Sequence, residues 1–410
     1  MESSFDLLVE RGFVHQTSND AALREALRRP ITLYCGYDAT ATSLHIGNLV
    51  TIMLLAQLQQ AGHRPIGIVG GGTTMVGDPS GKTEARPMLS REQIRSNEEG
   101  LKRQLGRYLR FDEDGALLLD NAEWLLELRY VDFLREIGRH FSVNQLLQHE
   151  TYRERLQGSG LSFIELNYAL LQAYDFLHLY REHGCRLQIG GSDQWFNILA
   201  GTELIRRVTG GEAFALVTPL ITTASGAKMG KTERGAVWLD AERTSPYEFY
   251  QYWVNTEDPD VGRFLRLFTF LPEEEIRRLE SLEGAELRDA KEVLAFEVTR
   301  LRDGEAAARE VRASARALFS GDRGNLETVP TTGIPAARLD EGIEAAELFQ
   351  TCGLAPSKAA ARRLIDQGGA YLGDQRVERA DQRVTRADLG GNGLLLRAGK
   401  KRYHRVVAAD

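Results

Sequence analysis

The stretch from residue 31 to residue 69 constrains the fold more than any other part of the chain. It begins with a short apolar run, residues 31–35, that is typical of a buried β-strand, and a loop rich in Thr and Asp follows Gly36. Residues 49–58 are an apolar run long enough for a helix, and residues 64–69 resemble a second buried strand. Strand, helix and strand in this order form a parallel βαβ unit. The sequence therefore predicts an α/β fold with a Rossmann-like, doubly wound parallel sheet.

The loop between this strand and this helix has the composition of a polyanion site. It contains Thr40 and Thr42 and ends in the sequence HIGN, residues 45–48. A helix N-terminus that follows a strand binds phosphate groups, because its first N–H groups have no partner within the helix. His45 adds a further donor near that first turn. Taken alone, this segment is better explained as an ordinary turn that happens to contain a histidine, so other residues must decide.

Two common nucleotide-binding motifs do not fit the sequence after the second strand. The glycine run 70–72 does not continue as G-x-G-x-x-G, because Met75 stands at the last position. Residues 77–83, GDPSGKT, resemble a P-loop but have only three residues between the glycines, and the next residues, EARP, do not begin a helix. The sequence thus argues against a dinucleotide-binding enzyme and a P-loop NTPase.

Polar residues also follow one narrow face of a predicted helix. Tyr168, Gln172 and Asp175 have the spacing i, i+4 and i+7 within residues 162–176, and apolar residues flank them. A solvent-exposed helix face is the alternative, but such faces are usually wider and richer in Lys and Glu. This stripe therefore indicates the polar lining of a pocket. Residues 187–197, LQIGGSDQWFN, predict a strand, a glycine turn and a helix start, where Ser192 or Asp193 would form the N-cap.

Residues 218–240, termed the Lys loop below, contain the sequence KMGKT at 228–232. Alone, it is best explained as a solvated lysine pair in a hairpin. Together, HIGN and KMGKT resemble the HIGH and KMSKS signatures of the class I aminoacyl-tRNA synthetases. Asn48 replaces the second His, and Gly230 and Thr232 replace the two Ser, yet the amide still offers a donor and Thr keeps a hydroxyl. The chain as a whole is similar to the bacterial tyrosyl-tRNA synthetases.

This resemblance implies four segments. A Rossmann-like catalytic domain is expected over residues 1–240, with a dimer-contact insertion at about 120–160, and an α-helical domain that faces the anticodon arm over 241–325. A linker at 326–342 would precede a small α+β, S4-like RNA-binding domain at 343–410. The last segment holds 12 Lys and Arg against 8 Asp and Glu, whereas the whole chain holds 51 against 58. A basic module on an acidic body is the pattern expected of a domain that touches a polyanion.

The resemblance also assigns roles to individual residues. The catalytic group, which would stabilise charge on the phosphates, comprises Thr40, His45, Lys82, Arg86, Lys228, Lys231 and Thr232. The tyrosine-binding group comprises Tyr34 and Asp175 at the phenol hydroxyl, Asp78, Tyr168 and Gln172 at the ammonium group, and Gln194 near the carboxylate. The group at ATP and the adenylate comprises Cys35, Gly36, Asp38, Thr40, His45, Gly47, Asn48, Gly191, Asp193 and Lys231.

The expected reaction is tyrosine–tRNA ligation. L-Tyrosine and ATP would give tyrosyl-adenylate and pyrophosphate, and tyrosine would then pass to the 3′ end of tRNA(Tyr). ATP is a substrate here and brings Mg²⁺ with it, while no tightly bound protein metal is expected. A homodimer without membrane association is expected. The three cysteines lie far apart and the N-terminal residues are acidic, which favours a reducing cytoplasm over secretion.

Three other functions remain to be compared with this one. A nucleotidylyltransferase acting on a small molecule also uses a histidine turn, but it would leave the Lys loop and the basic C-terminal module without a role. A non-catalytic RNA-binding relative is disfavoured because Thr40, His45, Asp78 and both lysines of KMGKT are present. Within the synthetases, a tryptophanyl enzyme is the nearest rival, and the Tyr34 and Asp175 pair is the feature that discriminates against it.

Overall fold

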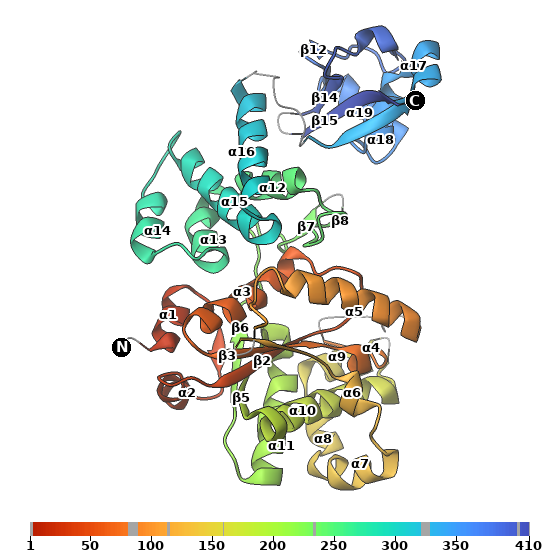
Figure 1. Cartoon of the computed structure of the whole chain (residues 1–410). Coiled ribbons are helices and arrows are strands. Elements are labelled where there is room, and N and C mark those ends of the chain that lie inside the picture. Colours follow the sequence, from red (N-terminus) through yellow and green to blue (C-terminus); the bar gives the residue numbers. More distant parts are fainter. Residues whose placement is uncertain are drawn as a thin grey trace. The chain divides into compact units, whose positions relative to one another are not determined.

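A computed structural model describes residues 3–80, 89–112, 115–158, 160–232, 235–320, 329–399 and 402–409. The chain divides into two compact units, one within residues 1–243 and 256–302 and the other within residues 244–255 and 303–410 (Figure 1). This division rests on compactness alone, so the domain boundaries predicted above stay predictions. Each unit is described by itself.

The first unit is built on a six-stranded sheet with the order β1-β6-β5-β2-β3-β4. Its strands are β1 (Gln16–Thr17), β2 (Thr32–Tyr37), β3 (Arg64–Val69), β4 (Leu117–Asp120), β5 (Cys185–Gly191) and β6 (Phe214–Thr218). Five of them are parallel, and only the two-residue edge strand β1 is antiparallel. The predicted βαβ unit is confirmed as β2, α3 and β3. Strand β1 was not expected, because residues 1–29 have a helical pattern.

Helices cover both faces of this sheet, with α3 and α5 on one face and α10 and α11 on the other (Figure 1). The helices of this part are α1 (Ser4–Glu10), α2 (Asp20–Ala26), α3 (Ile46–Gln60), α4 (Gly71–Thr74), α5 (Arg91–Leu105), α6 (Ala122–Leu125), α7 (Tyr130–Glu136), α8 (Val143–Leu147), α9 (Glu150–Gln157), α10 (Phe163–His183) and α11 (Trp195–Thr209), with short 3₁₀ turns η1 (Gly138–His140) and η2 (Ser192–Gln194). Because α3 leads from β2 to β3 and α11 leads from β5 to β6, the sheet is wound in two directions. This is the doubly wound arrangement that the sequence predicted.

A helical region completes the first unit. It consists of η3 (Asp258–Asp260), α13 (Val261–Phe268), α14 (Glu273–Glu280) and α15 (Leu287–Asp303). Arg11 binds this region at the end of α13, where it donates hydrogen bonds to the carbonyl oxygens of Arg266, Thr269 and Leu271 at 3.1, 2.9 and 2.7 Å. Cations stabilise helix C-termini because the last carbonyl groups have no partner within the helix.

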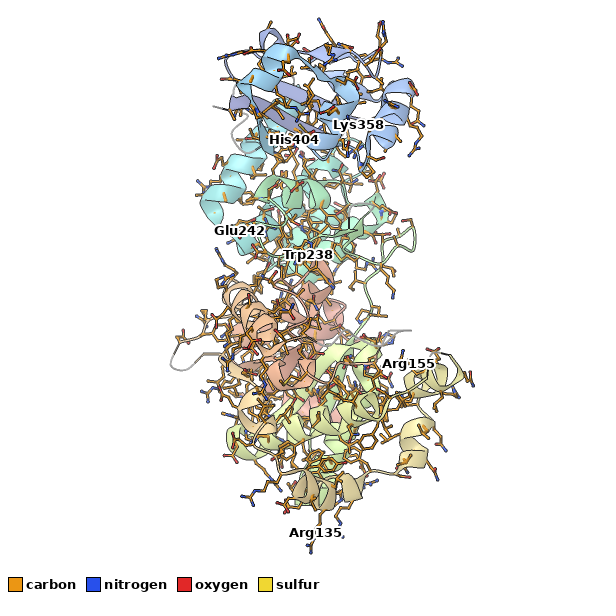
Figure 2. All side chains as sticks on the ribbon, turned by 90° about the vertical axis from the view of Figure 1, so that its right-hand side faces the viewer. Arg135, Arg155, Trp238, Glu242, Lys358 and His404 are labelled. Atoms are coloured by element: carbon orange, nitrogen blue, oxygen red, sulfur yellow. The ribbon has the colours of Figure 1, made fainter. Side chains whose placement is uncertain are left out.

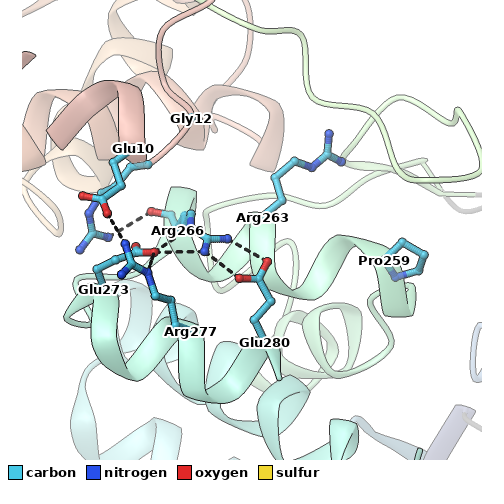
Figure 3. Close-up of a pocket in the computed structure, with 9 residues that line it drawn as sticks. Glu10, Gly12, Pro259, Arg263, Arg266, Glu273, Arg277 and Glu280 are labelled. Carbon is cyan, nitrogen blue, oxygen red and sulfur yellow. Dashed lines mark hydrogen bonds and ion pairs between the residues drawn. The ribbon is translucent and has the colours of Figure 1, made fainter. Parts of the chain in front are cut away.

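Ion pairs extend this contact along α1 and α14 (Figure 3). Arg266 pairs with Glu273 at 3.1 Å and with Glu280 at 2.7 Å, and Arg277 pairs with Glu273 at 3.1 Å and with Glu10 at 2.7 Å. These residues line a cavity of about 490 Å³ together with Arg11, Gly12, Pro259 and Arg263. None of the predicted site residues lies in it, so the cavity is a feature of the α1–α13–α14 contact.

The second unit contains two larger helices, α12 (Pro246–Val254) and α16 (Glu305–Ser320), and a C-terminal α+β domain. The domain's main sheet has the order β12-β11-β14-β15-β9, and β10 pairs with β13 separately. Its elements are β9 (Thr331–Pro335), α17 (Ala336–Glu341), β10 (Ile343–Glu344), α18 (Ala345–Thr351), α19 (Lys358–Asp366), β11 (Ala370–Leu372), β12 (Gln375–Arg376), β13 (Arg383–Val384), η4 (Arg386–Asp388), β14 (Leu394–Ala398) and β15 (Arg402–Ala409).

The structure differs from the predicted linker within residues 326–342. Strand β9 pairs in parallel with β15, from Thr331 opposite Arg405 to Pro335 opposite Ala409, and α17 follows it. The Gly, Pro and Thr content of this segment is typical of a linker. It is also compatible with β9, because β9 is an edge strand and proline is tolerated in edge strands. Among the residues described, no helix is long and apolar enough to cross a membrane.

Candidate active site

Most of the predicted site residues that the structure describes lie where the winding of the sheet reverses, between β2 and β5. Open α/β sheets bind ligands beyond the carboxyl ends of their strands at such a point. Strand β2 carries Tyr34 and is followed by Asp38, while β5 ends at Gly191. Helix α10 lies beside β5, and its predicted stripe is confirmed as part of one continuous helix.

Tyr34 and Asp175 form one buried end of this site. Their side chains are 2% and 3% exposed, and the Tyr34 ring packs against Phe176 at 5.2 Å between ring centres. The Tyr34 hydroxyl is buried and has no hydrogen-bond partner among the described residues. A buried hydroxyl without a partner is costly, so this atom is poised to pair with a polar group of a ligand.

Two residues that the sequence did not single out hold the Asp175 carboxylate. Asn121 Nδ2 donates to one carboxylate oxygen at 2.8 Å, and Trp124 Nε1 donates to the other at 2.7 Å. Burial raises the pKa of Asp175 to about 7, although both hydrogen bonds oppose this shift. Asn121 directly follows the carboxyl end of β4, as other site residues follow β2 and β5. That position in the sequence could have identified it as a candidate site residue. Trp124 gave no such signal.

Asp38 forms a second polar cluster near the middle of the site. Its carboxylate accepts hydrogen bonds from Thr73 Oγ1 at 2.9 Å and from the Tyr168 hydroxyl at 3.2 Å. Gln172 lies one turn after Tyr168 on α10, and its Oε1 is buried without a partner among the described residues. The cluster thus offers acceptors to a cationic group.

Asp78 and Gln194 form a third cluster. Gln194 Nε2 donates to Asp78 Oδ2 at 2.8 Å, and Ser80 N donates to Oδ1 at 2.9 Å. Burial, together with the charge of Asp38, raises the pKa of Asp78 to about 6. Gln194 ends η2 and is the residue directly before α11. The expected Ser192 or Asp193 cap of α11 is not formed, because η2 occupies those residues.

The HIGN turn is held by a reciprocal pair of hydrogen bonds at the start of α3. Gly47 N donates to His45 Nδ1 at 2.9 Å, and His45 N donates to Asn48 Oδ1 at 3.1 Å. This arrangement satisfies donors that an open helix N-terminus would leave free. His45 is therefore the N-cap of α3, and Asn48 completes the capping box through its amide oxygen.

The Lys loop lies against the HIGN turn. Ile46 N donates to Val237 O at 3.0 Å, and Val237 N donates to Gly230 O at 2.9 Å. Gly230 has a φ of +82°, and a Cβ built there would lie 3.4 Å from Gly47 N. Only glycine adopts this conformation readily and permits this approach. The structure therefore brings together two motifs that are about 180 residues apart in the sequence.

The remaining predicted residues divide into three groups. The first group is exposed to solvent and comprises Gly36, Thr40, Asp193 and Lys228. Cys35 is buried between β2 and α3, on the opposite face of the sheet from Tyr34, and burial raises its pKa to about 11. Lys82 and Arg86 lie outside the described residues, and only the backbone of Lys231 and Thr232 is described, as strand β7 (Lys231–Thr232) paired with β8 (Gly235–Ala236).

Two family models match the chain, and together they cover most of it. The model for tRNA synthetases class I (W and Y) matches residues 25–320. The model for the Tyrosine--tRNA ligase SYY-like C-terminal domain matches residues 325–406. The second match begins before β9, in agreement with the pairing of β9 in the C-terminal sheet.

Similar proteins include complete relatives from bacteria. The chain is 54% identical to a tyrosine–tRNA ligase of Desulfatibacillum aliphaticivorans, over 98% of each chain, and 50% identical to one of Clostridium botulinum, over 99% of this chain and all of the relative. A truncated mitochondrial tyrosyl-tRNA synthetase of Aspergillus nidulans superposes with a TM-score of 0.71 at 29% identity, covering 78% of this chain and 95% of that one. These matches span both units, so the chain belongs to the class I tRNA synthetases and, within them, to the tyrosine–tRNA ligases.

Proposed function

We propose that this chain activates L-tyrosine with ATP at the β2–β5 site and then transfers tyrosine to the 3′ end of tRNA(Tyr). The observation that carries the residue assignments is the buried Tyr34 hydroxyl, which has no hydrogen-bond partner in the described part of the chain and lies close to the buried carboxylate of Asp175. A phenol hydroxyl fits this end, since it donates to the carboxylate and accepts from Tyr34. Phenylalanine would offer no polar group to the Tyr34 hydroxyl and no hydrogen bond to Asp175, which would keep only Asn121 and Trp124 as donors, and this loss is costly.

The rest of the amino acid would extend along α10 towards the strand ends. Asp78, Tyr168 and Gln172 would surround the ammonium group, with Asp38 reinforcing the negative field. Gln194 would lie near the carboxylate, which it approaches from the start of α11. The tyrosine carboxylate is already a nucleophile, so the first step requires no protein base and depends on positioning.

The HIGN turn and the Lys loop would hold the nucleotide. The charge that grows on the phosphates of ATP would be stabilised by His45, Thr40, Lys82, Arg86, Lys228, Lys231 and Thr232. Mg²⁺, which accompanies ATP, would contribute to this stabilisation. Gly36, Gly47, Asn48, Gly191 and Asp193 would lie along the ribose and base. Cys35 is also assigned to the ribose, although its thiol lies beneath α3.

Replacing Tyr34 with phenylalanine tests this assignment. The variant removes one hydrogen bond at the phenol hydroxyl, and we expect about a 3- to 10-fold loss of tyrosine affinity with no loss of phenylalanine affinity. Equilibrium dialysis with both amino acids measures the ratio. Tyr37→Phe is the matched control, because Tyr37 is a buried tyrosine of the same strand whose hydroxyl lies 3.3 Å from Thr51 Oγ1 of α3. An unchanged ratio in Tyr34→Phe would contradict the assignment.

We also propose that the chain forms a homodimer through the segment between β4 and α10. Large apolar side chains are exposed in this segment and in the first turn of α10, namely Leu126, Tyr130, Val131, Leu134, Val143, Leu156, Phe163 and Ile164. Exposed apolar patches of this kind mark protein interfaces, and a two-fold dimer would bury the same patch on both subunits.

Val131→Asp is expected to dissociate this dimer, since Val131 is 72% exposed in the single chain and a buried carboxylate without a partner is costly. Light scattering after size-exclusion chromatography measures the mass. Val9→Asp is the control, because Val9 is an exposed valine of α1 outside the segment. A dimer that survives in Val131→Asp, or a wild-type monomer, would reject this interface.

The C-terminal domain is proposed to be S4-like and to bind tRNA through phosphates and shape. Its surplus of Lys and Arg supports this role. Ending the chain at Ser320 removes β9 together with the strand that it pairs with, and leaves α16 complete. We expect tyrosyl-adenylate formation to persist within about twofold, and tRNA tyrosylation at low tRNA concentration to fall by about 100-fold or more. Equal loss of both steps, measured by single-turnover assays, would contradict an RNA-binding role.

The rival activities have less support. A nucleotidylyltransferase or an RNA-binding relative leaves the phenol-binding end without a purpose. The indole N–H of tryptophan could donate to the Asp175 carboxylate, but an indole has no acceptor for the Tyr34 hydroxyl, whereas a phenol hydroxyl serves both groups. The cytoplasm is the proposed location, because all three cysteines are free and tRNA is the partner.

A further inference from the structure

Charged side chains of the helical region bind the main chain of the Lys loop at residues that precede its two lysines. Asp260 is 3% exposed, and its Oδ2 accepts a hydrogen bond from Ala224 N at 2.7 Å. Arg263 pairs with Asp260 at 2.7 Å and also donates a hydrogen bond to Thr222 O. In Figure 3, Arg263 points away from the other charged side chains of the α1–α13–α14 cavity. Asp260 and Arg263 therefore fasten the backbone at the start of the loop.

A second buried charge holds the loop after its lysines. Arg302 of α15 is 2% exposed, and its Nη1 donates to Trp238 O at 3.2 Å. Trp238, labelled in Figure 2, forms an antiparallel bridge with His45, directly before α3. Arg302 thus supports the segment through which the Lys loop contacts the HIGN turn.

Neighbouring charges on the same elements behave differently. Asp258 pairs with Lys291 and its side chain is 70% exposed, while Arg300 pairs with Glu297 of its own helix at 2.6 Å. Asp260 and Arg302, by contrast, are buried and bind main-chain atoms of the Lys loop. Burying a charged group is costly unless it is hydrogen-bonded. If the Lys loop moved away, Asp260 and Arg302 would lose these hydrogen bonds while still buried. The contacts therefore favour the position of the loop seen in the structure.

We propose that Asp260 and Arg302 are positioning residues for adenylate formation. They fix the two limbs of the Lys loop so that Lys228 and Lys231 reach the phosphates of ATP. The inference rests on the proposed function, because it requires these lysines to act on ATP. It adds that the helical region, besides facing tRNA, sets the geometry of the catalytic loop.

The expected consequence is selective. Asp260→Ala leaves Ala224 N without its acceptor, and Arg302→Met removes the donor to Trp238 O. Each change is expected to lower kcat/KM for ATP in tyrosyl-adenylate formation by about tenfold, the size of one lost charge-assisted hydrogen bond. Tyrosine affinity depends on Tyr34 and Asp175, which take no part in these contacts, and is expected to change less than about twofold.

The experiment uses the full chain and six variants, one of which is Lys231→Ala. Stopped-flow measurement of adenylate formation gives kcat/KM for ATP, and equilibrium dialysis gives the tyrosine dissociation constant. Asp260→Asn keeps an oxygen that accepts from Ala224 N, so it is expected to retain most of the rate that Asp260→Ala loses. Asp258→Ala and Arg300→Met are the matched controls and are expected to behave as wild type. Hydrogen exchange provides a second readout, with faster exchange expected at the amides of residues 222–230 in Asp260→Ala.

Two results would overturn the inference. The first is an unchanged kcat/KM for ATP in Asp260→Ala and Arg302→Met, while Lys231→Ala still slows adenylate formation. The second is an equal loss of ATP and tyrosine use, which indicates general destabilisation. If Lys231→Ala is itself without effect, the proposed role of the Lys loop fails, and the inference fails with it. Lys231→Ala therefore separates failure of the inference from failure of the function beneath it.

Discussion

Asp175→Ala is expected to raise the dissociation constant of tyrosine by about 10- to 100-fold, with KM for ATP changed less than about threefold. The change removes the acceptor for the phenol hydroxyl. It also leaves Asn121 Nδ2 and Trp124 Nε1 buried without the partner that each has in the structure. Isothermal titration with tyrosine and steady-state kinetics in ATP measure the two effects. Glu182→Ala is the control, because Glu182 is an exposed carboxylate of the same helix.

The pH dependence of binding gives an independent check on Asp175. Burial raises its pKa to about 7, so the carboxyl group gains a proton as the pH falls from 8 to 6. Protonation removes the negative charge that accepts the phenol hydrogen bond, so tyrosine affinity is expected to fall over that range. Asp78, whose pKa is about 6, contributes mainly at the lower end of this range, so between pH 8 and 7 the dependence should be much weaker in Asp175→Ala. Equal losses of tyrosine and ATP binding, or an identical pH profile in the variant, would refute the phenol role.

Lys231→Ala is expected to slow tyrosyl-adenylate formation by about 10²- to 10³-fold and to leave tyrosine affinity unchanged. Fixed charges that meet developing phosphate charge act mainly on the transition state, and losses of this size follow their removal. The backbone of Lys231 follows Gly230, which contacts the HIGN turn, and this neighbourhood supports the proposed role. Rapid-quench measurement with saturating tyrosine determines the rate constant.

Lys102→Ala provides the control for this experiment, since Lys102 lies on α5 and pairs only with Glu99 among the described ion pairs. A variant Lys231→Ala that binds tyrosine weakly but forms adenylate at the normal rate would reverse the assignment. It would place Lys231 at the amino acid and require another source of charge at the phosphates.

Local patterns predicted the parts of this fold that depend on local interactions. The βαβ unit at residues 31–69 follows from strand and helix periodicity, and the stripe of Tyr168, Gln172 and Asp175 follows from the 3.6-residue repeat. The joining of HIGN and KMGKT was inferred from a family resemblance, and the structure brings the two segments into contact. Periodicity alone gives no reason for that contact.

Features that depend on distant partners were not predicted. Asn121 and Trp124 become significant only because β4 is parallel to β2 and β5, so that its carboxyl end lies on the same side of the sheet as the site. Helix α10 then brings Asp175 within hydrogen-bond distance of both residues. Strands β1 and β9 are edge strands whose pairing is decided by β6 and β15, so their own sequences carry little signal. The hydrogen bonds of Asp260 and Arg302 to the Lys loop likewise connect residues that are distant in the sequence.

Amino-acid-dependent exchange of pyrophosphate into ATP, run in parallel with tyrosine, phenylalanine and tryptophan, tests the central claim most directly. The account predicts exchange with tyrosine alone, because only its hydroxyl pairs with both Tyr34 and Asp175. Exchange with tryptophan would contradict the assigned specificity while keeping the class of enzyme. The absence of exchange with all three amino acids, from folded protein, would contradict the proposed reaction itself.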